Sequence, residues 1–289
     1  YWGKSSVSLN TPLNPSVSVT LSQSHLRAVT SACASRDLQG ERLWLNGEEV
    51  DITSSKRFRA CVDGVRRLAR DRLCPETGRV LVRASEWGGM GLRVASMNTF
   101  PTAAGLASSA AGYAALVACL AELFNAEETF PGELSTIARQ GSGSACRSLY
   151  GGFVAWRMGG GEEDGRDSRA EQVCDEGHWP ELRAVILVVS DEKKDTSSTE
   201  GMGTSVRTSA LLGFRASSGI VDERMEEIEA AYERRDFPAF AEVTMKDSNQ
   251  FHATCLDTYP PIFYMNDVSK SAVKIVHAYN EWKGKVCAG

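Results

Sequence analysis

The segment 101–112 constrains the fold of this chain more than any other. It reads Pro-Thr-Ala-Ala-Gly-Leu-Ala-Ser-Ser-Ala-Ala-Gly and runs directly into an alanine-rich, helix-forming stretch at 110–123. The start of a helix exposes unpaired N–H groups and the positive end of its dipole, which favours anions. Gly105 permits backbone geometry that a Cβ would resist, while Ser108 and Ser109 can cap the helix or donate to phosphate oxygens. The segment predicts a phosphate-binding loop, with an ordinary helix cap as the alternative.

Composition excludes some classes of function. The 289 residues are 42% hydrophobic and 24% charged, which is ordinary for a globular protein of two modest domains or one large one. A net charge of −5 argues against a nucleic-acid or membrane surface, so any polyanionic ligand must be met by locally placed Lys and Arg. No stretch approaches the roughly 20 apolar residues of a membrane span.

Eight cysteines form no C-x-x-C pair or other spacing typical of metal ligands. We therefore expect reduced thiols and a cytoplasmic location. The sequence opens at Tyr1 without a Met or a secretory leader, and we expect its N-terminus to be truncated.

Hydrophobic periodicity predicts an α+β fold, because strands and helices mix without strict βαβ alternation. Strands are expected at 16–21, at 26–32 as its hairpin partner, and at 42–45, 92–97, 153–156 and 182–189. Helices are expected at 56–73, 110–123, 131–140, 221–232, 238–251 and 268–282. The glycine-rich, charged residues 159–177 predict an exposed hairpin or mobile loop. A domain boundary is expected near residue 180.

A second chemically suggestive cluster spans residues 139–152, where Gly and Ser alternate ahead of Arg147. Such a segment allows close backbone approach and supplies hydroxyl donors, and the planar guanidinium suits a carboxylate or phosphate. A flexible turn with a surface arginine is the alternative. Polar clusters at 190–199 and 246–249 are, taken alone, a solvated loop and a polar helix face.

Taken together, these segments resemble the eukaryotic-type diphosphomevalonate decarboxylases of the GHMP small-molecule kinase superfamily. The glycine loop resembles the second superfamily motif. Further strings cover nearly the whole chain: Tyr-Trp-Gly-Lys at 1–4, 141–152, 188–202, and Asp-Ser-Asn-Gln-Phe-His-Ala-Thr-Cys at 247–255 with Tyr-Pro-Pro-Ile-Phe-Tyr-Met-Asn-Asp at 259–267. Mevalonate kinase and homoserine kinase share only the loop and the fold.

The resemblance implies a two-domain GHMP kinase-like fold. Residues 1–180 would form a mixed α/β N-terminal domain with the ATP phosphate loop, and residues 181–289 a mainly helical-on-sheet C-terminal domain, incomplete at its C-terminus. It also implies an ATP-dependent lyase of isoprenoid and sterol biosynthesis. The enzyme would phosphorylate the C3 hydroxyl of (R)-5-diphosphomevalonate and release phosphate and CO2 to give isopentenyl diphosphate. ATP, Mg2+ and a homodimer follow from the resemblance, with no nucleic-acid or membrane partner.

The same resemblance implies site residues. Substrate-binding positions are Tyr1, Trp2, Gly3, Lys4, Arg57, Ser142, Gly143, Ser144, Ala145, Cys146, Arg147 and Thr199. Catalytic positions are Arg147, which would hold the carboxylate beside C3, and Lys4 and Ser198, which would position the reacting groups. ATP-binding positions are Gly105, Leu106, Ala107, Ser108 and Ser109. Mg2+ is expected to bridge the ATP phosphates, with no metal ligand from the protein.

Two departures matter. The family has an aspartate in a Phe-Asp-Ala-Gly-Pro-Asn segment near the C-terminus, and no residue here matches it. Ser5-Ser6 stands where the family usually has a charged pair. We expect the sequence to be part of a longer enzyme. Two alternatives are a GHMP kinase that does not decarboxylate, which the Arg147 motif disfavours, and a non-catalytic nucleotide-binding relative, which the missing aspartate permits.

Overall fold

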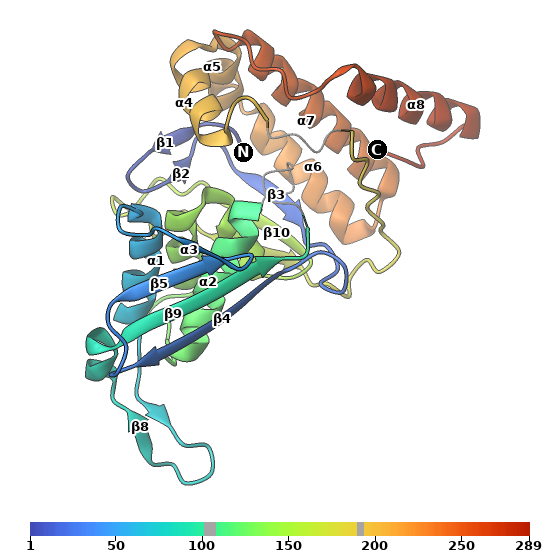
Figure 1. The fold of residues 1–289 in the computed structure, drawn as a ribbon. Coiled ribbons are helices and arrows are strands. Elements are labelled where there is room, and N and C mark those ends of the chain that lie inside the picture. The colour runs from blue at the N-terminus through green and yellow to red at the C-terminus, as the bar shows by residue number, and fades with distance from the viewer. Residues whose placement is uncertain (101–107, 190–193) are drawn as a thin grey trace. The chain divides into compact units, whose positions relative to one another are not determined.

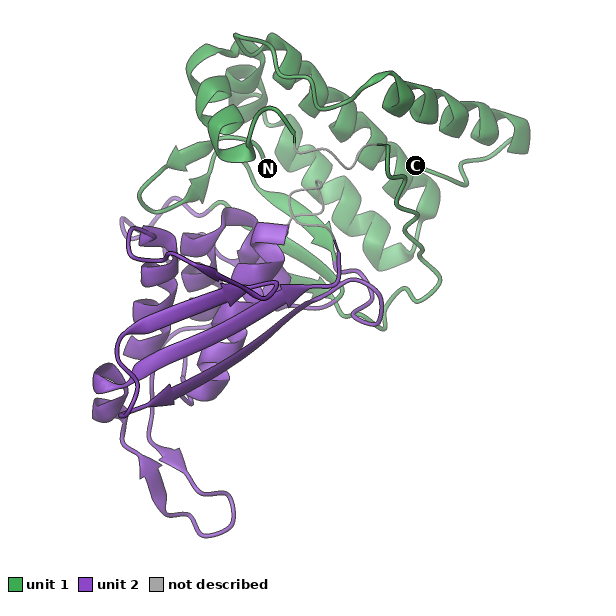
Figure 2. Cartoon of the chain, in the orientation of Figure 1, with its two compact units in different colours: residues 1–19, 152–158, 172–289 green, residues 20–151, 159–171 purple. Residues whose placement is uncertain are grey.

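The computed structural model describes residues 1–100, 108–189 and 194–289. The chain divides into two compact units, each discontinuous in sequence (Figure 2). Unit 1 comprises residues 1–19, 152–158 and 172–289, and unit 2 comprises 20–151 and 159–171. Helices and sheets are mixed in the chain, which confirms the α+β class. The division of the sequence at residue 180 stays a prediction.

Unit 2 contains a four-stranded sheet in the order β4-β9-β5-β6. Its strands are β4 (Ala28–Ser35), β9 (Gly91–Asn98), β5 (Glu41–Leu45) and β6 (Glu48–Val50). The strand expected at 42–45 is confirmed, and so is its turn: Asn46 and Gly47 both have positive φ, as a tight hairpin between β5 and β6 requires. The strand expected at 92–97 is also confirmed.

The hairpin expected between 16–21 and 26–32 is wrong. Strand β3 (Ser16–Val19) pairs antiparallel with β10 (Phe153–Trp156), and β4 pairs antiparallel with β9. The alternation of apolar residues marks each segment as a strand, but it does not say which strand lies beside it.

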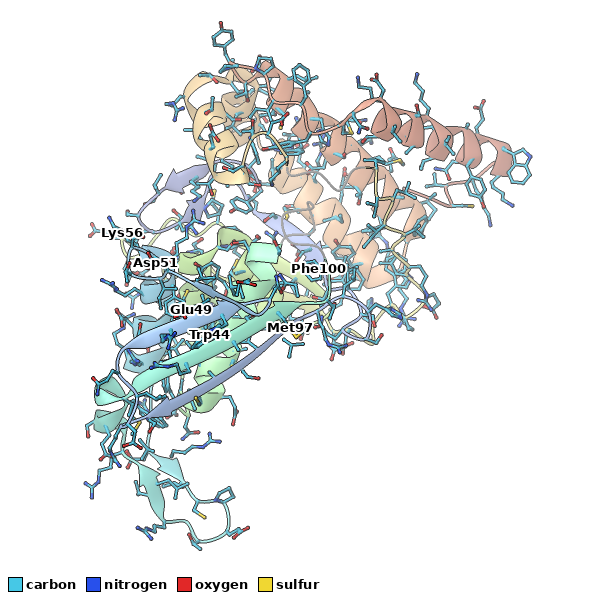
Figure 3. All side chains as sticks on the ribbon, in the orientation of Figure 1. Trp44, Glu49, Asp51, Lys56, Met97 and Phe100 are labelled. Atoms are coloured by element: carbon cyan, nitrogen blue, oxygen red, sulfur yellow. The ribbon has the colours of Figure 1, made fainter. Side chains whose placement is uncertain are left out.

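Helices cover one face of the unit 2 sheet (Figure 1). They are α1 (Lys56–Arg67), α2 (Ser108–Leu123) and α3 (Glu133–Gly141), followed by the 3-10 segment η2 (Gly143–Leu149). Leu92 and Val94 of β9 point into this layer and are almost fully buried. The opposite face carries Trp44, Glu49 and Met97, and Met97 is 54% exposed (Figure 3). Smaller elements complete the unit: β7 (Arg72–Leu73), β8 (Val80–Val82) and η1 (Ala84–Gly89).

Unit 1 contains most of a three-stranded sheet in the order β11-β10-β3, of which β11 (Ala170–Cys174) enters the unit at residue 172. A two-stranded ribbon, β1 (Lys4–Ser6) with β2 (Thr11–Pro12), precedes it. The remaining elements are helices: α4 (Ser198–Thr208), α5 (Ala210–Ser217), α6 (Ile220–Arg234), α7 (Phe237–Asp257) and α8 (Asp267–Lys283). The helices expected at 221–232, 238–251 and 268–282 are confirmed.

The apolar stripe of α6 forms the core of unit 1. Val221 and Met225 pack on Ala155 of β10, and Tyr232 packs on Phe153 with ring centroids 4.3 Å apart. Residues four and seven apart lie on one helix face, so this stripe follows from the sequence pattern.

The strand predicted at residues 182–189 is wrong. Residues 182–189, expected as a buried strand, have no regular structure, and Val185 is 83% exposed. An apolar run becomes a strand only where a neighbouring strand pairs with it. Residues 159–177, expected as an exposed hairpin or mobile loop, are exposed at 159–164 and continue into strand β11, which lies beside β10. The turn before β11 is held from α3, where the buried Arg139 donates to the carbonyls of Gly165 and Ser168.

Among the described residues, we find no helix that is both long and apolar enough to span a bilayer.

Candidate active site

The first predicted site residues, Tyr1 to Lys4, belong to unit 1, where Trp2 anchors them. Trp2 is buried, and its indole Nε1 donates to Ser205 Oγ of α4 at 2.8 Å. Its ring also meets Phe251 of α7 edge-on, with centroids 5.0 Å apart. Tyr1 packs edge-on against Trp156, at 4.6 Å. Because an aromatic side chain buries a large area and its N–H is satisfied, Trp2 holds this terminal segment in a fixed position.

Gly3 gives the segment its direction. It has a φ of +92°, a region that residues with a Cβ rarely adopt, and a Cβ there would lie 2.6 Å from Leu13 Cδ1. The chain therefore bends at Gly3 and places Lys4 at the start of β1, opposite Pro12. Beside it, Ser5 and Thr11 share a hydrogen bond of 2.8 Å between their hydroxyls, which occupies one of the two serines that depart from the family pattern.

The start of α4 meets the same segment. Ser197 caps this helix by accepting from Glu200 N, so Ser198 and Thr199 lie in its first turn. Packing here is close: a Cβ on Gly201 would lie 3.0 Å from the Trp2 ring. The structure thus brings Trp2 and the first turn of α4, two predicted parts of the site, together.

Lys194 lies beside a predicted site residue, and the sequence predictions did not include it. Its Nζ donates to Ser198 Oγ at 2.8 Å and lies 5.8 Å from the centroid of the Tyr264 ring. The Lys193-Lys194 pair was visible in the sequence, but a mixed-charge cluster is more often a solvated loop. Its contact with Ser198 adds a cation beside a predicted catalytic hydroxyl.

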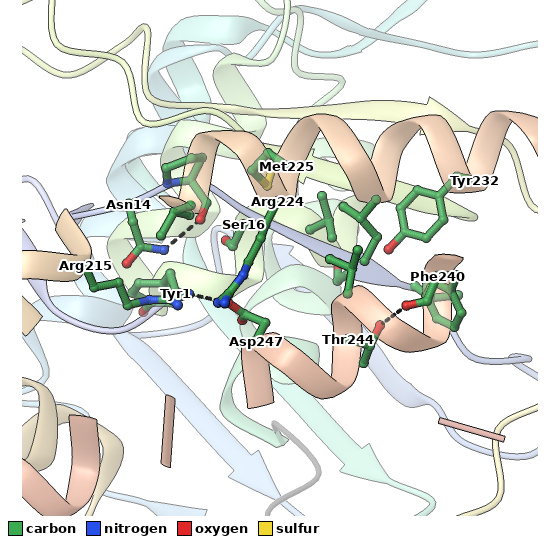
Figure 4. A pocket seen from close by; sticks show the side chains of 17 residues that line it. Tyr1, Asn14, Ser16, Arg215, Arg224, Met225, Tyr232, Phe240, Thr244 and Asp247 are labelled. Atoms are coloured by element: carbon green, nitrogen blue, oxygen red, sulfur yellow. Dashed lines mark hydrogen bonds and ion pairs between the residues drawn. The ribbon is translucent and has the colours of Figure 1, made fainter. Parts of the chain in front are cut away.

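A cavity of about 280 Å3 lies beside Tyr1 within unit 1 (Figure 4). Apolar side chains from β3, α6 and α7 line most of it, and Arg215, Arg224 and Asp247 line its polar end. Asp247 Oδ1 accepts from Arg215 Nη2 at 2.6 Å and from Arg224 Nη1 at 3.1 Å. Both arginines also donate to Gln250 Oε1. This ionic cluster joins α5, α6 and α7 behind Tyr1.

In unit 2, Arg57 is the second residue of α1 and is exposed. Ser55 caps the helix by accepting from Phe58 N at 3.3 Å. The first turn holds no acidic residue, and Lys56 and Arg57 stand there together. Cations are disfavoured at the positive end of a helix dipole. Lys56 and Arg57 thus add two positive charges to the positive end of α1, and charge of this sign suits a phosphate group.

The Ser142–Arg147 segment is a 3-10 turn that follows α3: Ser142 lies between α3 and η2, and residues 143–147 are the first five of η2. Ser142 is the C-cap of α3, and Ala145 N donates to its carbonyl at 2.8 Å. Ala145 and Cys146 are fully buried, whereas Ser142, Ser144 and Arg147 are partly exposed. Burial raises the pKa of the Cys146 thiol to about 12, so Cys146 stays neutral near pH 7. Buried residues thus hold this turn in place while its serines and Arg147 reach solvent.

The predicted ATP-binding residues are only partly described. Ser108 and Ser109 begin α2, as expected, and the first turn of that helix holds no acidic residue. Gly105, Leu106 and Ala107 lie outside the described residues. Within residues 1–100, 108–189 and 194–289, no group of three or more His, Cys, Asp and Glu side chains could hold a metal ion.

The chain matches two family models, a diphosphomevalonate decarboxylase-like N-terminal domain at residues 1–170 and a mevalonate 5-diphosphate decarboxylase C-terminal domain at 184–289. It is 56% identical to a diphosphomevalonate decarboxylase of Aspergillus fumigatus over 292 aligned positions, covering 100% of this chain and 70% of that protein. The chain belongs to the diphosphomevalonate decarboxylase family. Members of this family have the GHMP kinase fold, and the fold predicted for this chain is confirmed.

Solved structures of the family have a similar fold. A crystal structure of mevalonate 5-diphosphate decarboxylase is 48% identical and superposes with a TM-score of 0.88, covering 99% of this chain and 71% of that one. A second structure, a complex with MVAPP, AMPPCP and magnesium, is 28% identical with a TM-score of 0.77, covering 100% of this chain and 80% of that one.

Proposed function

We propose a role in the family's reaction for each group of site residues. The reaction is the ATP-dependent decarboxylation of diphosphomevalonate in the mevalonate pathway, which yields isopentenyl diphosphate, ADP, phosphate and CO2. The chain is accordingly an ATP-dependent carbon–carbon lyase of isoprenoid biosynthesis.

The substrate is an anion at both ends, with a diphosphate at one and a carboxylate at the other. A protein of net charge −5 must therefore supply cations locally. Each unit offers cations of its own: Lys4 and Lys194 in unit 1, and Arg57 and Arg147 in unit 2. Tyr1, Trp2 and Gly3 place Lys4, and Thr199 adds a hydroxyl from the first turn of α4.

Arg147 is proposed to hold the substrate carboxylate next to C3. A guanidinium binds a carboxylate in two parallel hydrogen bonds and fixes its plane. Gly143 and the buried Ala145 and Cys146 support the turn, while Ser142 and Ser144 offer hydroxyl donors beside Arg147. When the phosphorylated C3 oxygen leaves, the carbon becomes cation-like, and breaking the bond to the fixed carboxylate relieves that charge. Catalysis of this kind is mostly positioning and charge stabilisation.

Lys4 and Ser198 are proposed to position the groups that react at C3. Lys194 supports this role for Ser198, because its ammonium donates to the Ser198 oxygen. The hydroxyl proton of Ser198 is therefore directed away from Lys194 and is available to a substrate oxygen.

Ser108 and Ser109 are proposed to bind ATP phosphates, together with Gly105, Leu106 and Ala107. The start of a 16-residue helix without acidic residues in its first turn fits a nucleotide phosphate. When bound, ATP supplies the phosphoryl group that turns the C3 hydroxyl into a leaving group. Mg2+ would be held by the phosphates, and the complex of a relative with AMPPCP and magnesium supports both ligands.

The observation that carries this proposal is the support given to the Ser142–Arg147 turn, which fully buried residues hold while its serines and Arg147 stay accessible. A coupled assay of the full-length protein with diphosphomevalonate and Mg-ATP tests it. Equal formation of ADP and isopentenyl diphosphate is expected. ADP alone would indicate a kinase, and neither product, despite ATP binding, a non-catalytic relative.

A cytoplasmic homodimer is also proposed. All eight cysteines are free thiols, which supports a reducing compartment. The dimer rests on the family resemblance. Light scattering on the purified protein gives the mass in solution, and a monomeric mass would contradict a dimer.

A further inference from the structure

Ser205 of α4 has no role in the site proposed so far, yet it binds the side chain that anchors the first four residues. Its hydroxyl oxygen accepts the indole N–H of Trp2 at 2.8 Å and lies 2.7 Å from the hydroxyl oxygen of Thr258, the C-cap of α7. The Thr258 hydroxyl in turn donates to the carbonyl of Thr254 at 2.9 Å. A chain of three hydrogen bonds thus joins the N-terminal segment to α4 and to the end of α7.

The chemistry of the two ends fixes the direction of every bond in this chain. An indole N–H can only donate, and a carbonyl oxygen can only accept. The Thr258 proton is directed to the carbonyl of Thr254, so the Ser205 proton is donated to Thr258. Trp2, Ser205 and Thr258 are all buried. A buried chain in which each group has its partner holds the groups that it joins in one arrangement.

Trp2 lies along one turn of α4. A Cβ on Gly201, four residues before Ser205, would lie 3.0 Å from the Trp2 ring. The next residue of the N-terminal segment is also close to this helix, since a Cβ on Gly3 would lie 3.3 Å from Cγ2 of Val206. Strand β1, which follows directly, contacts α4 as well. The bond to Ser205 therefore determines where along α4 the N-terminal segment lies.

We propose that Ser205 is a positioning residue that fixes Lys4 relative to Ser198 in the first turn of α4. All of these residues belong to unit 1. The inference rests on the proposed function, because it needs Lys4 and Ser198 to act on the same substrate. Ser205 acts through Trp2, whose ring shifts along α4 when the acceptor of its N–H is removed. A small displacement of groups that act on a reacting centre lowers the rate strongly, so loss of this one hydroxyl is measurable in turnover.

The test is Ser205→Ala in the full-length protein, with kcat referred to the folded fraction. We expect kcat to fall about tenfold, while KM for ATP stays within about twofold of the wild type. The matched control is Ser209→Ala, another buried serine of unit 1, whose hydroxyl donates to Asp257 at 2.8 Å and caps α5. The control should lose stability but keep its kcat. A tenfold fall in both variants would overturn the inference, and so would an unchanged kcat in Ser205→Ala.

Thr258 offers a pair of variants that leave Ser205 in place. Thr258→Val has nearly the shape of threonine but cannot accept the Ser205 proton, whereas Thr258→Ser keeps the hydroxyl. We expect Thr258→Val to lower kcat and Thr258→Ser to stay within about twofold of the wild type. Equal kcat values for the two variants would overturn the inference.

A double-mutant cycle with Trp2→Phe tests whether Ser205 acts through the indole. The phenyl ring has no N–H to donate, so Ser205→Ala should change kcat by less than about twofold in this background. The same tenfold fall in that background would overturn the inference.

Failure of this inference can be told apart from failure of the proposed function. Hydrogen exchange of the Trp2 indole N–H, followed by NMR, needs neither substrate nor turnover. We expect exchange at least about tenfold faster in Ser205→Ala than in the wild type and in Ser209→Ala. Equal rates in all three would overturn the inference. A wild type that forms no product would contradict the proposed reaction, while the exchange rates would still decide whether Ser205 fixes Trp2.

Discussion

Arg215 and Asp247 connect two helices of unit 1, with Nη2 of the arginine donating to Oδ1 of the aspartate across 2.6 Å. The arginine side chain is only 6% exposed, whereas the aspartate is 43% exposed. A buried guanidinium is tolerated only with a partner, because the desolvation of its charge is costly. The same carboxylate also accepts from Arg224, so a single side chain serves two cations.

Replacing Asp247 by Ala should lower the free energy of unfolding by about 2 kcal/mol, less than for a fully buried pair because water reaches the carboxylate. Denaturant titration measures this loss. Glu242→Ala is the matched control, since Glu242 pairs with Lys246 on the surface of the same helix. Its loss should stay within about 0.5 kcal/mol. If the two substitutions lowered the free energy of unfolding equally, the burial of Arg215 would not make its ion pair more stabilising than a surface pair.

Gly141→Ala should destabilise the protein by about 1–3 kcal/mol, because the new methyl group would collide with the Tyr113 ring and with Cys61 Sγ at 2.8 Å. Gly213→Ala is the control. Gly213 lies inside helix α5 with nothing within 4 Å of a Cβ, and alanine there should stabilise by up to about 1 kcal/mol. Thermal unfolding of both variants measures the difference, and a neutral Gly141→Ala would contradict the close packing.

Arg147→Ala should lower kcat about 100-fold, as loss of one charge-assisted contact to the transition state typically does, while affinity for ATP stays unchanged. Steady-state kinetics with each substrate varied in turn gives both constants. Arg72→Ala removes a surface arginine of the same unit, paired with Glu122, and should leave kcat unaltered. Full turnover by Arg147→Ala would show that the carboxylate is held by another group.

The thiol of Cys146 should make stability fall at high pH. Burial raises its pKa from an ordinary 9.0 to about 12, so the folded state keeps the proton that the unfolded chain loses. This contribution is complete below pH 9 and is lost as pH rises from 9 towards 12. Melting temperatures measured across that range should decline less steeply for Cys146→Ala than for the wild type. Parallel curves would mean that the thiol does not contribute.

Regular elements with a strong local pattern could be predicted from the sequence. The stripe of α6 and the Asn46-Gly47 hairpin turn are fixed by residues close together in the chain, and both are as expected. Pairing between distant strands could not be predicted. The partner of β3 lies at residues 153–156, and nothing in the alternation at 16–21 distinguishes it from a nearer strand.

The predicted site residues come from long strings shared with the family. Such strings identify residues that contact a ligand more readily than residues that support them from behind. Lys194 illustrates the limit. A lysine in a mixed-charge loop carries no distinctive pattern. Its contact with Ser198 exists only in the folded chain.

The interleaving of the two units has a consequence for biosynthesis. Every residue of unit 2 has been synthesised once position 171 is reached, whereas unit 1 needs its first 19 residues together with segments that follow position 151. Domains generally fold as units while the chain is being made. Unit 2 is therefore expected to fold first on the ribosome, while β3 and β10 lack the helix α6 that packs on them until residues 220–234 are translated. Nascent chains with residue 171 outside the ribosome and α6 not yet made should protect unit 2 from protease and leave the N-terminal strands open to cleavage.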